Sequence, residues 1–166
     1  MILASWDAYS DEHTDLDGWP HDADAYGLRQ SKRDADTAAA FDTIHDSARH
    51  LLTTAETQLP QLPATSVQSR WVYQLGVLRD ALDHLDALRQ DWLSTRDSFP
   101  VGTGPGTPSY DDALADYHAE SWSYLRDWAD QGHTLTEIHR AARHTSPPAP
   151  RPTAAPLPAP ASKVRR

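Results

Sequence analysis

The sequence predicts an all-α protein, an antiparallel three-helix bundle made of a helical hairpin and a third helix, with a short fourth helix. Two observations predict this fold. Apolar residues recur at steps of three and four over long stretches, which places them on one face of a helix. The stretches are similar in length and are joined by short links rich in proline or glycine, as in an up-down-up bundle.

Residues 1–27 are predicted to form an irregular, acidic and aromatic arm. No apolar period runs through them, and aspartate and histidine are frequent. The first residues turn polar by Asp7, so the segment does not resemble a signal peptide. We expect the arm's aromatic side chains to dock on the helices; they are Trp6, Tyr9, Trp19 and Tyr26.

The first long helix is expected over residues 28–59. Its apolar stripe runs through Phe41, Ile44, Ala48, Leu51, Ala55 and Leu59. Pro60 and Pro63 end it, because proline lacks the amide hydrogen that a helix needs.

The second helix is expected over residues 66–96, with Thr65 or Ser66 as its cap. Its stripe contains Trp71, Leu75, Leu78, Leu82, Leu85 and Trp92. A loop with three glycines and three prolines follows at residues 99–108. The hairpin therefore closes on a third helix that starts at Ser109.

The third helix carries Asp111 and Asp112 in its first turn, where they favour the positive end of the helix dipole, and Gly132 ends it. Thr134 and Glu137 have the spacing of a capping box, which predicts a short fourth helix over residues 135–144. Together, residues 28–145 form the predicted helical bundle domain.

Residues 146–166 are predicted to be a disordered Pro/Ala-rich tail. Seven prolines lie between residues 147 and 160, and the segment carries four basic and no acidic side chains. All 24 acidic residues lie before residue 146, so the rest of the chain is strongly acidic although the net charge of the whole is −9. Such a body repels nucleic acid and anionic membranes and favours positively charged partners.

The composition bears on the chemistry, the cellular location and the source of the protein. The chain has no cysteine, which excludes disulfides and a thiolate nucleophile and favours a cytoplasmic location. No stretch is long and apolar enough to span a membrane. Arginine outnumbers lysine by 13 to 2, and alanine is abundant, which indicates a GC-rich bacterial genome.

Asp15-Leu16-Asp17-Gly18 resembles the nucleophile motif of haloacid dehalogenase-type phosphatases, which would imply a catalytic aspartate. That motif follows a buried strand, and no such strand precedes it here. The same stretch could instead bind a metal ion, and would then make the protein a small metal-dependent enzyme. Its possible donors are His13, Asp15, Asp17, His21, Asp22 and Asp24.

Two other patterns fall short of a site. Asp42 and His45 have the spacing of a helical metal pair, but no second pair exists, so His45 is interpreted as a partly buried structural histidine. Gly102, Gly104 and Gly106 lack the lysine and the preceding strand of a phosphate loop.

Residues 125–142 resemble the opening half of bacterial helix-turn-helix domains, a helix and a glycine followed by a Thr-x-x-Glu-Ile helix. The resemblance implies DNA binding. However, prolines stand at 147, 148, 150 and 152, where a recognition helix would begin. A DNA-associated accessory regulator would therefore use residues 125–146 with Arg140, Arg143 and the basic tail.

Trp71, Trp92, Trp122 and Trp128 could border a ligand pocket, but their helical spacing favours a place in the core. No pattern supplies a catalytic, cofactor-binding or metal site. The leading hypothesis is therefore a non-enzymatic helical protein–protein interaction module that self-associates, as the coiled-coil-like stripes allow, or binds one partner protein. The DNA-associated regulator and the metal-dependent enzyme are the alternatives.

Overall fold

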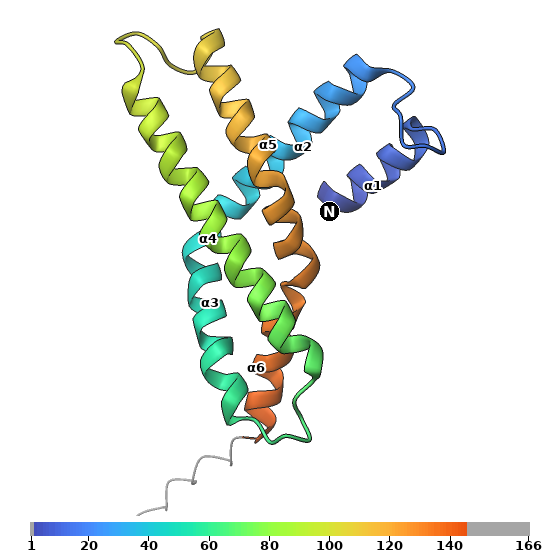
Figure 1. Ribbon diagram of the computed structural model, residues 1–166, viewed down its shortest axis with the longest axis vertical. Coiled ribbons are helices and arrows are strands. Elements are labelled where there is room, and N and C mark those ends of the chain that lie inside the picture. Colours follow the sequence, from blue (N-terminus) through green and yellow to red (C-terminus); the bar gives the residue numbers. More distant parts are fainter. Residues whose placement is uncertain (1, 146–166) are drawn as a thin grey trace, which may run out of the picture.

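A computed structural model describes residues 2–145, and this part of the chain is all helical, as predicted (Figure 1). The predicted tail, residues 146–166, lies outside the described residues. None of the described helices is long and apolar enough to cross a membrane. The helices are α1 (Ile2–His13), α2 (Ala23–Asp42), α3 (His45–Gln58), η1 (Leu59–Gln61), α4 (Ser69–Ser98), α5 (Pro108–Gln131) and α6 (His133–Thr145).

The two longest helices, α4 and α5, form an antiparallel hairpin (Figure 1). Their bounds lie close to those predicted for the second and third helices. Near the loop the pair is closed by aromatic rings, with Trp92 against Tyr110 at 5.3 Å and Tyr117 at 6.0 Å between ring centroids. The predicted cap at Thr65 or Ser66 is wrong, because α4 begins at Ser69 after Gln68.

The predicted single helix over residues 28–59 is wrong, because the chain breaks between α2 and α3. Thr43 and Ile44 are β-branched, and the Thr43 hydroxyl donates to the Ala40 carbonyl at 2.8 Å. Ile44 has φ −118° and ψ 0°, outside helical geometry. The break lets α2 pack against α5, while α3 turns to lie beside α4 and α6. The predicted antiparallel three-helix bundle is therefore not confirmed.

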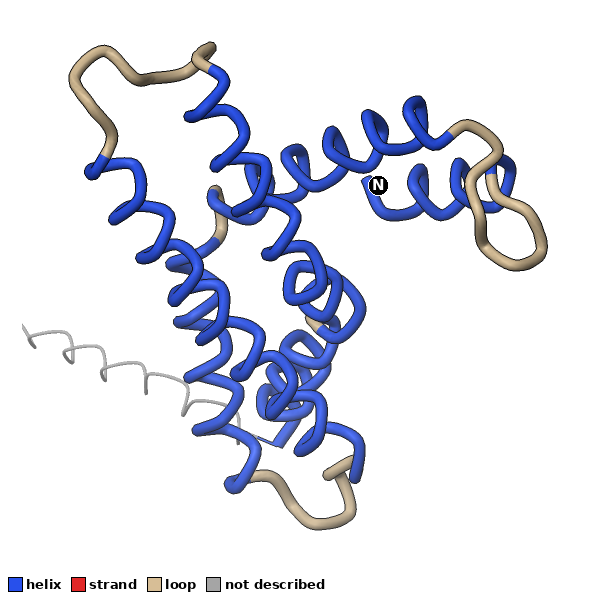
Figure 2. Tube along the Cα trace, turned by 45° about the horizontal axis from the view of Figure 1, so that its top comes forward, coloured by secondary structure: helices blue, strands red, loops and turns tan. Residues whose placement is uncertain are grey.

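The predicted irregular arm is also wrong. Most of residues 1–27 are helical, in α1 and the first turns of α2. The two helices run side by side and project from the rest of the molecule (Figure 2). Trp6 contacts Tyr26 edge-on, with 5.1 Å between ring centroids, and Tyr9 lies against both rings. These three aromatic residues therefore pack on one another within the arm, and the fourth, Trp19, is 72% exposed, so the predicted docking on the bundle is not confirmed.

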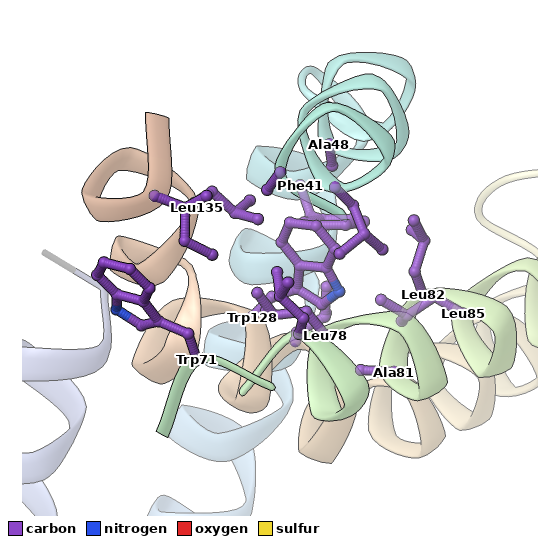
Figure 3. Packing of buried hydrophobic residues seen from close by; sticks show 14 of the residues in the cluster. Phe41, Ala48, Trp71, Leu78, Ala81, Leu82, Leu85, Trp128 and Leu135 are labelled. Atoms are coloured by element: carbon purple, nitrogen blue, oxygen red, sulfur yellow. The ribbon is translucent and has the colours of Figure 1, made fainter. Parts of the chain in front are cut away.

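The core lies where α3, α4, α5 and α6 meet the C-terminal end of α2, which contributes Ala38 and Phe41 (Figure 3). Leu78 and Leu82 are at most 1% exposed, which confirms the centre of the stripe predicted for α4, and Ile138 of α6 is fully buried beside them. The α3 stripe is only partly right. Ile44 and Leu51 are 51% and 52% exposed, and Leu52 is buried in place of its neighbour.

Candidate functional site

A wide hollow lies between α3 and α6, and we call it the α3–α6 groove. Its volume is about 600 Å³. One wall is Leu51, and the floor includes Leu135. Four basic or titratable side chains of α6 complete it, so the hollow combines apolar surface with positive charge. The lining residues are Leu51, Gly132, Leu135, Thr136, His139, Arg140, Arg143 and His144.

The groove exists because one face of α6 is anchored to α4. The Thr134 hydroxyl donates to Gln74 Oε1 at 2.8 Å, and Gln74 Nε2 donates to Gln131 at 2.7 Å. Glu137 accepts hydrogen bonds from Trp71 Nε1 at 2.8 Å. The face of α6 that carries Arg140 is thereby turned to solvent.

Gly132 sets the join between α5 and α6. A Cβ at this position would lie 2.6 Å from the Trp128 carbonyl oxygen, closer than carbon and oxygen can approach. Glycine therefore allows α6 to follow α5 with almost no linker.

The electrostatics of the groove differ from those of the remaining surface. Eight of the eleven lysine and arginine side chains in residues 2–145 form ion pairs within that part of the chain. Of the other three, Arg29 lies over the Tyr9 ring at 5.4 Å. Arg140 and Arg143 have no carboxylate partner among the described residues. Two of the three basic side chains without an ion pair in residues 2–145 therefore lie on the groove.

A second, smaller hollow of about 200 Å³ lies at the α2–α3 break. It is almost wholly apolar, with Ile44 at its edge and Phe41 and Trp128 in its wall. Trp128 precedes Gly132 by one turn, and Ile44 precedes Leu51 by two turns on α3. The two hollows therefore follow one another along the same side of the molecule.

The loop between α1 and α2, residues 14–22, is the second distinctive surface, and we call it the acidic loop. Leu16 is fully exposed, and Trp19 is 72% exposed. The Asp15 carboxylate accepts the amides of Asp17 at 3.0 Å and Trp19 at 2.9 Å, and the backbones of Thr14 and Pro20 pair. The loop is thus an ordered turn that holds two apolar side chains in solvent.

The residues considered as metal donors or as a phosphatase nucleophile serve this turn. Asp15 bonds the loop amides, Asp22 caps α2 by accepting the Ala25 amide at 3.0 Å, and His13 stacks on Tyr9. Asp17, His21 and Asp24 do not converge on them. No group of three or more histidines, aspartates or glutamates in residues 2–145 has the arrangement of a metal site.

The Asp42 and His45 pair is separated by the helix break. His45 Nε2 lies 2.6 Å from Asp86 of α4, and the side chain is 15% exposed, which agrees with a partly buried structural histidine. Asp42 faces Arg89 instead, at 3.9 Å. Arg49 also pairs with Asp86, so the cluster joins α3 to α4.

The glycine loop is a turn. Gly102 and Gly106 have φ of 97° and 90°, the left-handed region that favours glycine. The Gly106 amide donates to the Asp111 carboxylate at 3.0 Å. An amide already bonded to a carboxylate does not offer itself to a phosphate.

Residues that carry the helix-turn-helix resemblance make contacts within the protein. Thr134 and Glu137 do not form a capping box, because α6 begins at His133 and both side chains bond to α4. Ile138 is fully buried. The position of a recognition helix lies outside the described residues.

No family model, curated protein or solved structure matches this chain. Its function must therefore be inferred from the geometry of its own residues.

The four tryptophans considered for a pocket take separate places. Trp71 and Trp128 are buried in the core, whereas Trp92 packs between tyrosines of the α4–α5 hairpin. Trp122 lies under the Arg33 guanidinium, whose carbon is 3.5 Å from the ring centroid. They do not enclose a common pocket.

Sequence patterns did not indicate the joint between the arm and α5. The guanidinium of Arg33 lies between Trp6, at 4.1 Å, and Trp122. Arg33 also pairs with Asp34 at 2.5 Å, and both side chains are buried. Burial raises the pKa of Asp34, while Arg33 and then His118 oppose that rise. Arg33 is one of three basic residues in α2, beside Arg29 and Lys32, so nothing in the sequence singled it out.

Proposed function

We propose that this protein is a non-enzymatic interaction module whose α3–α6 groove holds an acidic, partly apolar segment of a protein. The observation that carries the proposal is that Arg140 and Arg143, which have no ion pair within residues 2–145, lie beside the half-exposed Leu51. Arginine and exposed aliphatic surface are what protein interfaces use to bind carboxylates and apolar side chains together.

The use of the buried polar groups supports binding over catalysis. Asp34 is paired with Arg33, and Thr134, Gln74 and Gln131 satisfy one another. An active site brings titratable groups to a cleft with their reactive atoms free. The buried groups named here instead bond to other side chains of the protein.

Nucleic acid is the second candidate partner, because Arg140 and Arg143 could also contact phosphates. The charge of the molecule weighs against it. Residues 1–146 hold all 24 acidic side chains and 11 of the 15 basic ones, which makes this part a net repellent for a polyanion. We expect a gel-shift titration with duplex DNA at low salt to stay flat. Salt-dependent binding lost on Arg140→Glu/Arg143→Glu would favour the DNA-associated role.

The test places a photo-crosslinking amino acid at Thr136, an exposed position in the groove, in the full chain within its native host. We expect a discrete protein adduct. Mass spectrometry identifies the crosslinked partner as a second copy of the chain or as another protein. The adduct should disappear when Arg140→Glu/Arg143→Glu is added. A crosslinker at exposed Ser123, on α5, serves as the control and should give no such adduct.

An adduct that survives the charge reversal, or forms equally from Ser123, would contradict the proposal. So would the absence of any adduct from Thr136.

A further inference from the structure

We infer that the segment held by the α3–α6 groove is the acidic loop, residues 14–22, of a second copy of this chain. The inference rests on the proposed function and names its partner. Three observations support it. The loop presents apolar side chains, its charge is opposite to that of the groove, and it cannot reach the groove of the same copy.

The acidic loop presents apolar side chains that can cover the exposed apolar surface of the groove. Leu16 and Trp19 are both strongly exposed, although side chains of this size are usually buried. The bonds of Asp15 to the loop amides keep the turn in shape before any contact forms. Because the loop is already ordered, binding it costs little conformational entropy.

The charges of the two surfaces are complementary. No lysine or arginine occurs before Arg29, and the carboxylates around the loop form no ion pair within the described residues. These free carboxylates are Asp11, Glu12, Asp17 and Asp24. The groove carries the free arginines 140 and 143. Each surface therefore supplies the counter-charge that the other lacks within its own copy.

The arm's position makes the contact intermolecular. The acidic loop lies at the outer end of the α1–α2 pair, far from α6 in both views (Figures 1 and 2). The arm is fixed to α5 by the Arg33 clamp and by Arg126, which pairs with Asp7 at 3.0 Å. A loop on a fixed arm cannot fold back onto its own groove, so it meets the groove of another molecule.

Two copies that exchange loops form two equivalent contacts, and such a reciprocal pair closes as a dimer. The basic tail is a poor occupant by comparison. Its charged residues are Arg151, Lys163, Arg165 and Arg166, all of the same sign as the groove.

The first test uses the absence of cysteine, since two engineered thiols are then unique. We expect a short bis-maleimide to link Asp17→Cys in one chain to Thr136→Cys in an isotopically labelled second chain, as identified by peptide mapping. The control pair joins Val101→Cys with Thr136→Cys. Val101 is as exposed as Leu16 but lies on another loop, and should give no link.

The second test measures mass by light scattering of the purified full chain. We expect twice the 18.4 kDa chain mass. Leu16→Ser/Trp19→Ser and Arg140→Glu/Arg143→Glu should each weaken the dimer by at least about tenfold, because each removes one side of the contact. Val101→Ser should leave the dimer unchanged.

A charge exchange gives the sharpest result. A chain with Asp11→Lys/Glu12→Lys/Asp17→Lys/Asp24→Lys has a net basic loop region and a basic groove, and Arg140→Glu/Arg143→Glu makes both surfaces acidic. Each variant alone should be monomeric, and their mixture should form a heterodimer, because both contacts are then complementary. A mixture that stays monomeric, or a wild-type chain that is monomeric at high concentration, overturns the inference. An adduct at Thr136 with a different protein would then still support the proposed function.

Discussion

The body of the molecule and its arm are held together by different forces. In the body, α3 to α6 and the C-terminal end of α2 bury a continuous set of aliphatic and aromatic side chains, with Leu78 and Ile138 fully excluded from water. In the arm, Trp6 is the only buried residue of α1, and Arg33 and Arg126 join this helix to α5. The body is held by a hydrophobic core, whereas α1 is joined to α5 by two cations, one between two rings and one paired with Asp7.

This difference explains how the chain can expose apolar residues at a defined place on its surface. The aliphatic core makes the body cooperative, since loss of one layer weakens all the helices around it. The arm adds little core, and can therefore extend its loop into solvent without weakening the body. The residues it exposes, Leu16 and Trp19, remain available for a partner.

The largest expected effect is in the body. Ile138→Ala should lower the free energy of unfolding by about 2–5 kcal/mol, because it leaves a cavity in a fully buried layer. Denaturant titration followed by circular dichroism measures it. Leu28→Ala on α2 is the control, since Leu28 is 76% exposed and should change the free energy by less than about 0.5 kcal/mol. Equal effects would remove the distinction between body and arm.

A smaller and local effect is expected in the arm. Arg33→Lys keeps the charge but loses the flat guanidinium between Trp6 and Trp122, which should cost about 1–2 kcal/mol. The loss should appear as faster amide hydrogen exchange in α1, with α4 unchanged.

The matched control for the arm is Arg29→Lys. Arg29 lies 5.4 Å from the Tyr9 ring and forms no ion pair within residues 2–145, so the variant should alter exchange in α1 much less. If Arg33→Lys lowers the protection of α4 as much as that of α1, the arm is not a separately held unit.

The sequence predicted the body better than the arm for the same physical reason. Long aliphatic stripes with a helical period specify α4 and α5, and Gly132 marks where α5 ends. The break at Thr43 and Ile44 has no proline or glycine, and depends on α2 and α3 finding different neighbours. The arm depends on one arginine between two tryptophans far apart in the chain, which leaves no periodic trace.

The candidate site was visible only in pieces. Arg140 and Arg143 stood out as basic residues in an acidic chain, but their lack of ion pairs is a tertiary fact. Leu51 and Leu52 are the same residue type, so only the angle of α3 after the break decides which one is exposed. The loop at residues 14–22 suggested metal ligands, because a pattern of carboxylates does not show which of them bond to their own backbone.

The smallest effect concerns pH and the anchor between α4 and α6. The Glu137 pKa is lowered by hydrogen bonds from Trp71 and then Arg70, so the folded state favours the carboxylate. Its contribution is present above the ordinary value of 4.5 and is lost as pH falls through the lowered folded pKa. We expect Glu137→Gln to be less stable than wild type at neutral pH by under about 1 kcal/mol, because the Arg70 pair is exposed to solvent.

That difference should shrink as the pH falls below 4.5. Burial raises the Asp34 pKa, and so works in the opposite sense, but Asp34 is present in both proteins and cancels in the comparison. Denaturant titrations of the two proteins at neutral and acidic pH measure the change. A difference that stays constant with pH would mean that the negative charge of Glu137 does not help to anchor α6 to α4.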